Sequence, residues 1–204
     1  MSAAPAATGH PEELIDWVDE QDRVLGVVTR ARMRAERLRH RAVYIVVVDE
    51  ADRFVVHQRA PWKDVWPAAW DIAFGGVVGT GEGWEAAASR ELAEEAGLVV
   101  GPTPVSALVA LGEPFRYEDQ SVALIGRAYL FSTNEAVVPG DGEVVAVERV
   151  PRRQLPRWIR SRLVCPDSLA CVLPRLVGPA RPVTSVTSVT SSGSSGSSGS
   201  ANGR

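Results

Sequence analysis

The sequence has a single lysine, Lys63, among its 22 basic residues, so arginine carries almost all of the positive charge. Because this bias runs through the whole chain, we interpret it as the codon bias of a GC-rich genome and not as a functional signal. The chain also lacks an excess of positive charge, with a formal net charge of -3 and a pI near 5.7. This balance argues against bulk attraction to nucleic acid or to an anionic membrane.

Cysteines and long hydrophobic segments are equally scarce. The two cysteines, Cys165 and Cys171, have no histidine or further cysteine clustered beside them, which argues against a metal or redox role. We expect reduced, partly buried thiols, as in a cytoplasmic protein. The first residues lack a positive segment followed by an apolar one, and apolar runs such as 42–48 are too short to span a bilayer. We therefore expect a cytoplasmic protein with no membrane partner.

Length and composition predict one folded domain between two flexible ends. The 204 residues are 45% hydrophobic and 23% charged, which is typical of a globular domain with a sizeable core. Residues 1–11 are small and proline-containing, so we expect a disordered N-terminus. Residues 182–204 repeat Ser, Thr, Gly and Val and cannot bury enough apolar surface to fold, which predicts a flexible tail. The domain then covers residues 12–181.

The order of the expected elements indicates an α+β fold. A short hairpin is expected over 16–18 and 24–28, followed by a helix over 30–39. Further strands are expected at 43–48, 54–58, 70–74, 104–111, 122–131 and 143–150, and helical tracts from 151 and over 167–176, with Pro156 forcing a kink or a restart. The strongest helix prediction covers 85–96 and ends at Gly97 in a left-handed conformation. Because strands and helices do not alternate strictly, a doubly wound parallel sheet is disfavoured.

The helix over 85–96 concentrates carboxylates on one side. At about 100° per residue, Glu91, Glu94 and Glu95 share a face about 100° wide. Arg90 precedes Glu94 by four positions and can pair with a carboxylate there. Three convergent carboxylates suit hard divalent cations, Mg²⁺ or Mn²⁺. The alternative is a solvated face built from glutamate because glutamate favours helices.

The wider spacing around these glutamates is more specific than the glutamates alone. It reads Gly76, five residues, Glu82, seven residues, Arg90-Glu91-Leu92, one residue, Glu94-Glu95, one residue and Gly97-Leu98. This pattern resembles the signature of the Nudix hydrolase family at every specified position. The resemblance implies an α/β/α sandwich around a mixed β-sheet, with the signature forming a loop, a helix and a second loop.

The resemblance also implies roles for individual residues. Glu91, Glu94 and Glu95 would be metal ligands, and Glu82 would anchor the loop and reach the metal through water. Arg90 would orient a carboxylate, and Gly76 and Gly97 would be needed for backbone geometry. The metal would neutralise a diphosphate and lower the pKa of a bound water, and a glutamate would take the proton. Which glutamate is this base, and how many metal ions bind, stay open.

Segments outside the signature resemble one branch of the family. "LIDWVDEQDRVLG", "LRHRAVYIVVVDE" and "CPDSL" are similar to proteins related to type 1 isopentenyl diphosphate isomerase, a branch with both isomerases and hydrolases. The isomerases place a catalytic cysteine and a metal-binding histidine where this chain has Phe74 and Gly76. We therefore prefer hydrolysis of a diphosphate bond in a nucleotide-like or other organic diphosphate. The alternatives are isopentenyl diphosphate isomerisation and nucleotide sensing without catalysis, and a homodimer is left open.

Further candidates lie outside the signature. Arg59 and Lys63 correspond to basic residues that hold diphosphate in relatives, and a guanidinium and an ammonium suit phosphate oxygens. Trp62 and Trp66 lie in the same loop and either stack on a base or pack the loop. The basic run over 30–41 is interpreted as a solvated helix, with His40 as a structural residue. For an extra carboxylate we choose Glu118 over Glu113 and Asp119.

Overall fold

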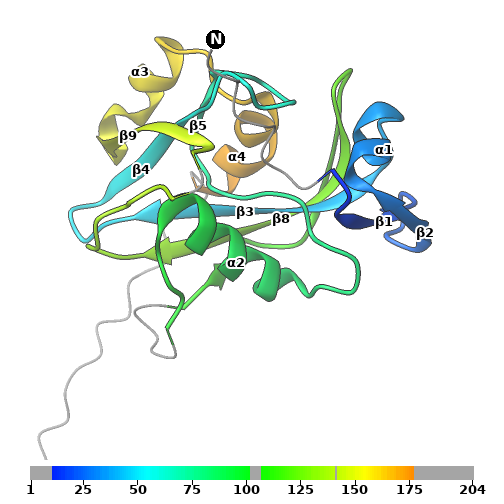
Figure 1. Cartoon of the computed structure of the whole chain (residues 1–204). Helices are drawn as coiled ribbons and strands as arrows, with labels where there is room; N and C mark the ends of the chain where they lie inside the picture. Colours follow the sequence, from blue (N-terminus) through cyan, green and yellow to red (C-terminus); the bar gives the residue numbers. More distant parts are fainter. Residues whose placement is uncertain (1–10, 102–106, 141, 177–204) are drawn as a thin grey trace, which may run out of the picture.

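The computed structural model describes residues 11–101, 107–140 and 142–176 of the chain (Figure 1). The predicted flexible tail 182–204, and all of the predicted disordered N-terminus except Pro11, lie outside the described residues. A membrane-crossing helix would need a longer and more apolar segment than any helix in the described part of the chain.

Within the described residues, seven strands form one mixed sheet. They are β3 (His40–Val48), β4 (Arg53–Arg59), β5 (Trp70–Asp71), β6 (Val109–Ala110), β7 (Phe115–Glu118), β8 (Ala123–Ser132) and β9 (Val144–Pro151). The sheet runs in the order β5-β4-β3-β8-β6, with β7 paired to β8 and β9 paired to β4. β3 and β8 are parallel along their whole length, and the other pairs are antiparallel. The predicted mixed sheet is confirmed.

Helices cover both faces of this sheet, which makes three layers (Figure 1). Val43, Ile45 and Val47 of β3 pack in one apolar cluster with residues of α2 (Trp84–Ala96) such as Leu92. The alternate residues of β3 pack in a second cluster with the C-terminal segments. These segments are α3 (Leu155–Arg160), the π-helical turn η3 (Ser168–Val172) and α4 (Leu173–Leu176), and the short η2 (Arg152–Gln154) leads into α3. A strand buried on both faces needs a continuous apolar run, which explains the sequence VYIVVV.

A small separate unit precedes the sheet. β1 (Leu14–Val18) and β2 (Val24–Thr29) form the predicted antiparallel hairpin, and α1 (Arg30–Ala35) follows directly. A third apolar cluster of Ile15, Val28 and Met33 with Val77 joins this unit to the loop before α2. The prediction of a helix over 30–39 was too long, because the chain leaves the helix at Glu36 and then turns with a φ of 50° at Arg37.

Several predicted boundaries also need correction. The strand expected over 70–74 ends at Asp71, and only a single bridge joins Phe74 to Ile45. The strand expected over 104–111 is reduced to Val109–Ala110, and residues 102–106 lie outside the described residues. The strand Phe115–Glu118 was missed. Pro156 lies in the first turn of α3, where a proline is tolerated because no helical hydrogen bond is lost there.

Candidate active site

Arg90 of α2 fastens the glutamates to the loop in front of the helix. Its Nε and Nη2 donate to the two oxygens of Glu82, both at 2.9 Å, and Nη2 also donates to the carbonyl of Val77 at 3.1 Å. Its Nη1 donates to Glu91 at 2.8 Å and to Glu94 at 3.2 Å. These bonds, that to Glu82 first, raise the pKa of Arg90. Arg90 is therefore a permanent cation that fixes three carboxylates at once.

Glu82 is used to shape the loop. Besides its two bonds from Arg90, its Oε2 accepts a hydrogen bond from the backbone N–H of Gly79 at 2.9 Å. The bond from Arg90 is the main reason that the pKa of Glu82 is lowered, so its carboxylate stays ionised. This geometry matches the loop anchor that the resemblance implied.

Glu91 and Glu95 are buried between α2 and the glycines of the loop. Glu95 accepts a hydrogen bond from the N–H of Gly75 at 3.0 Å. The carboxyl group of Glu91 packs on Gly76 so closely that a Cβ there would lie 2.4 Å from its Oε1. Burial raises the pKa of both carboxyls; the charge of Glu95 adds to this at Glu91, whereas Lys63 opposes it at Glu95. Two carboxyl groups are thus held out of water, with Arg90 paired to Glu91 and Lys63 near Glu95.

Glu94 lies at the edge of this cluster, with 53% of its side chain exposed. Among the described residues, no group of three or more His, Cys, Asp and Glu side chains is gathered closely enough to surround a metal ion. Arg90 instead bridges Glu91 and Glu94 through one nitrogen. Of the three glutamates that were predicted to converge, Glu91 and Glu95 form a buried pair and Glu94 is exposed.

A fourth carboxylate reaches the cluster through Lys63. The Nζ of Lys63 lies 3.7 Å from Oε1 of Glu95 and also donates to Glu143, just before β9. Sequence reasoning missed Glu143 because it reads as the first residue of a predicted strand. The chosen candidate, Glu118, is engaged elsewhere: it pairs with Arg39 at 2.8 Å and with Arg37 at 3.1 Å.

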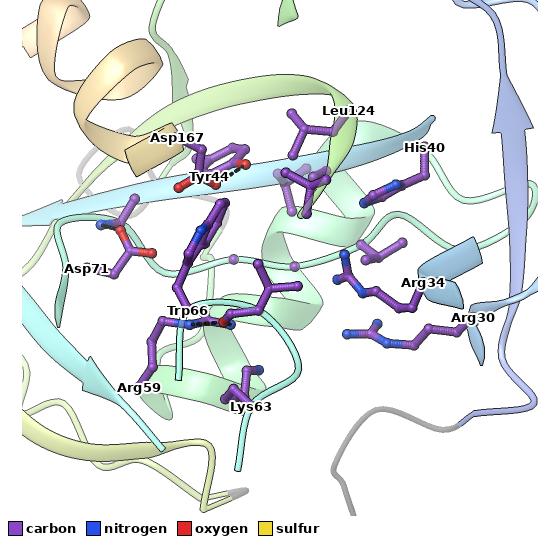
Figure 2. Close-up of a pocket in the computed structure, with 18 residues that line it drawn as sticks. Arg30, Arg34, His40, Tyr44, Arg59, Lys63, Trp66, Asp71, Leu124 and Asp167 are labelled. Carbon is purple, nitrogen blue, oxygen red and sulfur yellow. Dashed lines mark hydrogen bonds between the residues drawn. The ribbon is translucent and has the colours of Figure 1, made fainter. Parts of the chain in front are cut away.

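A cavity of about 550 Å³, counted to its open mouth, lies beside the loop (Figure 2). Gly75 and Gly76 form part of its wall, so it adjoins the glutamates. Both predicted substrate-binding residues, Arg59 and Lys63, line it. Arg59 donates from Nε and Nη2 to the carbonyl of Val65, at 3.3 and 3.2 Å. The cavity therefore offers two cations next to the candidate metal site.

Two carboxyls, Asp71 and Asp167, lie at the end of the cavity away from Arg30 and Arg34, on the same side as Arg59 (Figure 2). Tyr44 donates to Asp167 at 2.7 Å, and the hydroxyl of Ser168 donates to Asp71 at 2.6 Å. Burial, and then the charge of Asp71, raise the pKa of Asp167 to about 7. Sequence reasoning missed these residues, although Asp167 and Ser168 belong to the quoted segment "CPDSL".

His40, which was interpreted as structural, is buried, and so are His57 and both cysteines. His40 has Nδ1 at 2.9 Å from the carbonyl of Leu38, and burial lowers its pKa to about 3. His57 stacks on the fully buried Phe74 with ring centroids 4.4 Å apart. Cys165 and Cys171 are free and buried. The position of the isomerase cysteine is therefore filled by a packed aromatic ring.

Trp66 of the cavity loop and Trp70 of β5 pack against aromatic neighbours. Trp66 lines the cavity and meets Tyr117 edge-on, with centroids 6.3 Å apart. Trp62 is 37% exposed, and Trp70 packs edge-on against Trp158 at 5.3 Å. The two alternatives for the loop tryptophans were stacking on a base and packing the loop, and the structure shows Trp66 packed.

Comparison with known sequences agrees with this geometry. The family model of the NUDIX domain matches residues 38–166. An uncharacterized Nudix hydrolase of Streptomyces coelicolor is 45% identical over 93 residues, which are 46% of this chain and 51% of that protein. The uncharacterized Nudix hydrolase YfcD of Salmonella typhi is 38% identical over 117 residues, which are 57% and 60% of the two chains. The chain thus spans about half the length of the curated relatives it matches.

Solved structures share the fold. A Deinococcus radiodurans protein superposes with a TM-score of 0.64 at 24% identity, covering 81% of this chain and all of that one. The NUDIX domain of Shewanella oneidensis NrtR, solved with ADP-ribose, has a TM-score of 0.52 at 18% identity and covers 73% and 97% of the two chains. The α/β/α sandwich is thereby confirmed, whereas the isomerase-related branch stays a prediction. From its signature helix, its fold and the family model, this chain belongs to the Nudix hydrolase family.

Proposed function

We propose that the protein is a Mg²⁺-dependent hydrolase that cleaves a diphosphate bond in a nucleotide-like or other organic diphosphate. The observation that carries the proposal is the geometry of Glu91 and Glu95, two carboxyls buried side by side on α2 next to a cavity that is lined by Arg59 and Lys63. A divalent cation at this pair would stabilise both carboxylates, since burial disfavours the ionised form of a carboxyl and a nearby positive charge favours it. Its charge would also attract a diphosphate into the cavity.

The residues present fit Mg²⁺ or Mn²⁺. Carboxylate oxygens are the ligands that these hard cations prefer, and the absence of a side chain at Gly76 leaves room for the carboxylate of Glu91. Glu91 and Glu95 would hold the ion, with Glu94 joining them by turning its exposed side chain away from Arg90. Glu82 is committed to Arg90 and to Gly79, so we assign it an indirect role. When bound, the ion would neutralise phosphate oxygens and activate a water.

The protein's own groups supply binding and orientation. Lys63 lies between Glu95 and the cavity, so its ammonium would hold a diphosphate oxygen next to the metal site. Arg59 lines the same wall and would provide a second contact. Arg90 keeps the glutamates in place through its bonds to Glu82 and Glu91. Such fixed groups lower the barrier because they need no reorganisation during reaction.

Two alternatives are less well supported. Isomerisation of an alkene needs an acid and a base, but Phe74 is packed against His57 and Gly76 has no side chain. A sensor without catalysis is the second alternative, and the ADP-ribose complex of the NrtR domain shows that such a fold can bind this ligand. The unbroken signature favours catalysis here. We further infer a cytoplasmic location, because a reducing compartment suits the free Cys165 and Cys171.

A turnover screen tests the proposal. Nucleoside di- and triphosphates, dinucleotides, nucleotide sugars, ADP-ribose and isoprenoid diphosphates are incubated with the protein, with and without Mg²⁺, and products are separated. We expect Mg²⁺-dependent release of phosphate or a monophosphate from at least one compound.

Glu94→Gln should lose this activity. The control Glu36→Gln also removes an exposed glutamate that pairs with an arginine four residues before it, and it should keep the activity. If wild type and Glu94→Gln were equally inactive across the panel, the hydrolase proposal would be abandoned. Formation of dimethylallyl diphosphate from isopentenyl diphosphate would favour the isomerase instead.

A further inference from the structure

Arg34 departs from the solvated basic helix that the sequence suggested. It lies on α1, and its side chain is directed into the cavity together with that of Arg30 (Figure 2). The Nε of Arg34 is buried and has no hydrogen-bond partner among the described residues. The interpretation of this helix as a solvated face is therefore wrong at Arg34.

Positive charge dominates the surroundings of Arg34. A second hollow of about 280 Å³ adjoins the cavity, and Arg30, Arg34, Arg59 and Lys63 all line both. Asp64 is the one acidic residue of the seven that line this second hollow. Burial, followed by repulsion from Arg30, lowers the pKa of Arg34 to about 10, so the guanidinium is still charged at neutral pH.

The other cations of the cavity already have partners within the protein. Arg30 pairs with Glu13 at 3.1 Å, Lys63 pairs with Glu143 and approaches Glu95, and Arg59 donates to the carbonyl of Val65. The Nε of Arg34 has no such partner among the described residues, and Arg34 is attracted by Asp64 but repelled by Arg30 and Arg59. The unused capacity to bind an anion is therefore concentrated at Arg34.

An unpartnered buried donor has an energetic cost that a ligand can remove. Leaving a buried N–H without an acceptor is unfavourable, and more so when the group is charged. A guanidinium presents its N–H groups in a planar fork that matches two oxygens of one phosphate. The other end of the cavity, where Asp71 and Asp167 lie beside Arg59, has less net positive charge than the end with Arg30 and Arg34. An anionic ligand is thus directed to the Arg34 end.

We propose that Arg34 is a substrate-binding residue whose guanidinium receives a phosphate group, with Arg30 and Lys63 completing a phosphate subsite on the α1 side of the cavity. That the ligand is the substrate rests on the proposed function, whereas the phosphate affinity itself does not. The subsite extends the predicted pair Arg59 and Lys63 across the cavity to the hairpin unit. A phosphate held there spans two parts of the fold that are far apart in sequence.

Binding of inorganic pyrophosphate to the metal-free full-length protein tests the subsite. Isothermal titration after treatment with a chelating resin measures the dissociation constant without any contribution from the candidate metal site. We expect Arg34→Gln to weaken binding at least tenfold and Arg34→Lys to weaken it less, because lysine keeps the charge but loses the fork. Arg127→Gln is the matched control, since the Nε of Arg127 is also buried and unpartnered in the described structure but Arg127 does not line the cavity. It should bind pyrophosphate like wild type.

Two results would overturn the subsite. One is an Arg34→Gln protein that is folded by circular dichroism and binds pyrophosphate as tightly as wild type. The other is an equal loss in Arg127→Gln, which would assign the effect to general destabilisation. If Arg34→Gln does not fold, Arg34→Lys decides, since an unchanged dissociation constant there excludes a role for the guanidinium fork. A silent turnover screen combined with the expected binding losses would refute the hydrolase proposal and leave the subsite standing.

Discussion

Replacing Gly76 by alanine tests whether the position of the Glu91 carboxylate matters. The backbone of Gly76 is not in the left-handed region, so an alanine can adopt the backbone conformation of Gly76 without strain. The added Cβ, however, would lie 2.4 Å from Oε1 and 2.6 Å from both Cδ and Oε2 of Glu91. Ordinary contacts of a Cβ begin near 3.4 Å, so the carboxylate must move by about 1 Å (3.4 minus 2.4).

The displacement predicts a moderate loss of stability and a large loss of activity. Overpacking a filled site costs about 1–3 kcal/mol, and alanine recovers about 0.4–1 kcal/mol by restricting the unfolded chain. We therefore expect the free energy of unfolding to fall by about 0–2.6 kcal/mol, from 1 minus 1 to 3 minus 0.4. Because an error of about 1 Å in a reacting group can cost on the order of a hundredfold in rate, kcat/KM should fall by about that factor.

The measurements are urea unfolding and kcat/KM for a substrate found in the screen. Gly79→Ala is the matched control: it lies in the same loop, and its nearest contact would be 3.5 Å, from Oε2 of Glu82. It should keep near-normal turnover. A fully active Gly76→Ala protein, or an equal loss in Gly79→Ala, would refute the idea that Gly76 is required to accommodate Glu91.

The remaining predictions concern metal binding and pH. Mg²⁺ at ten times its dissociation constant should stabilise the folded protein by about 1.4 kcal/mol, and a melting temperature unmoved by millimolar Mg²⁺ or Mn²⁺ would count against the metal site. The pKa of Asp167 is about 7 in the folded state, above its unfolded value of about 3.9. Its favourable contribution is therefore complete below about pH 4 and is lost as the pH rises to about 7, by on the order of 1–3 kcal/mol. Urea unfolding at pH 4.5 and 7.5 should show this loss in wild type and a smaller one in Asp167→Asn; equal slopes would contradict the assignment.

The features that could be predicted from sequence are those fixed by local patterns. The run from Val43 to Val48 must be buried on both faces, and the structure places it at the centre of the sheet. The helix before Gly97 was predicted to within one residue, because helix-favouring residues fill it and Gly97 has the left-handed conformation (φ 66°, ψ 21°). The signature spacing also predicts that Arg90 lies beside the glutamates, because helical periodicity determines which side chains meet.

The features that were missed depend on contacts between distant segments. Glu143 meets Lys63 across 80 positions of the sequence, and Tyr44 meets Asp167 across 123. No periodicity within either segment indicates which residue of the other it will face. Short elements are missed by sequence prediction for a related reason. β7 has only four residues, and it is a strand because it pairs with β8 and not because of its composition.

The basic run over 30–41 shows how tertiary contacts change an interpretation. Composition alone predicts that an arginine-rich helix is solvated, and Arg32 does pair with Glu36 at the surface. Arg34 is turned inward because α1 packs its Met33 face on the hairpin and the loop before α2. The sequence shows the charge of Arg34, but it does not show the cavity that the Arg34 side chain enters in the folded protein.

The dependence of the cleavage rate on Mg²⁺ concentration tests the central claim most directly. For a substrate identified in the screen, wild type should be inactive without metal and should saturate as Mg²⁺ is added. Glu94→Gln should require more Mg²⁺ and reach a much lower plateau, with little change in unfolding free energy because Glu94 is exposed. Superimposable curves for wild type, Glu94→Gln and the control Glu36→Gln would show that Glu94 does not help to hold a catalytic metal.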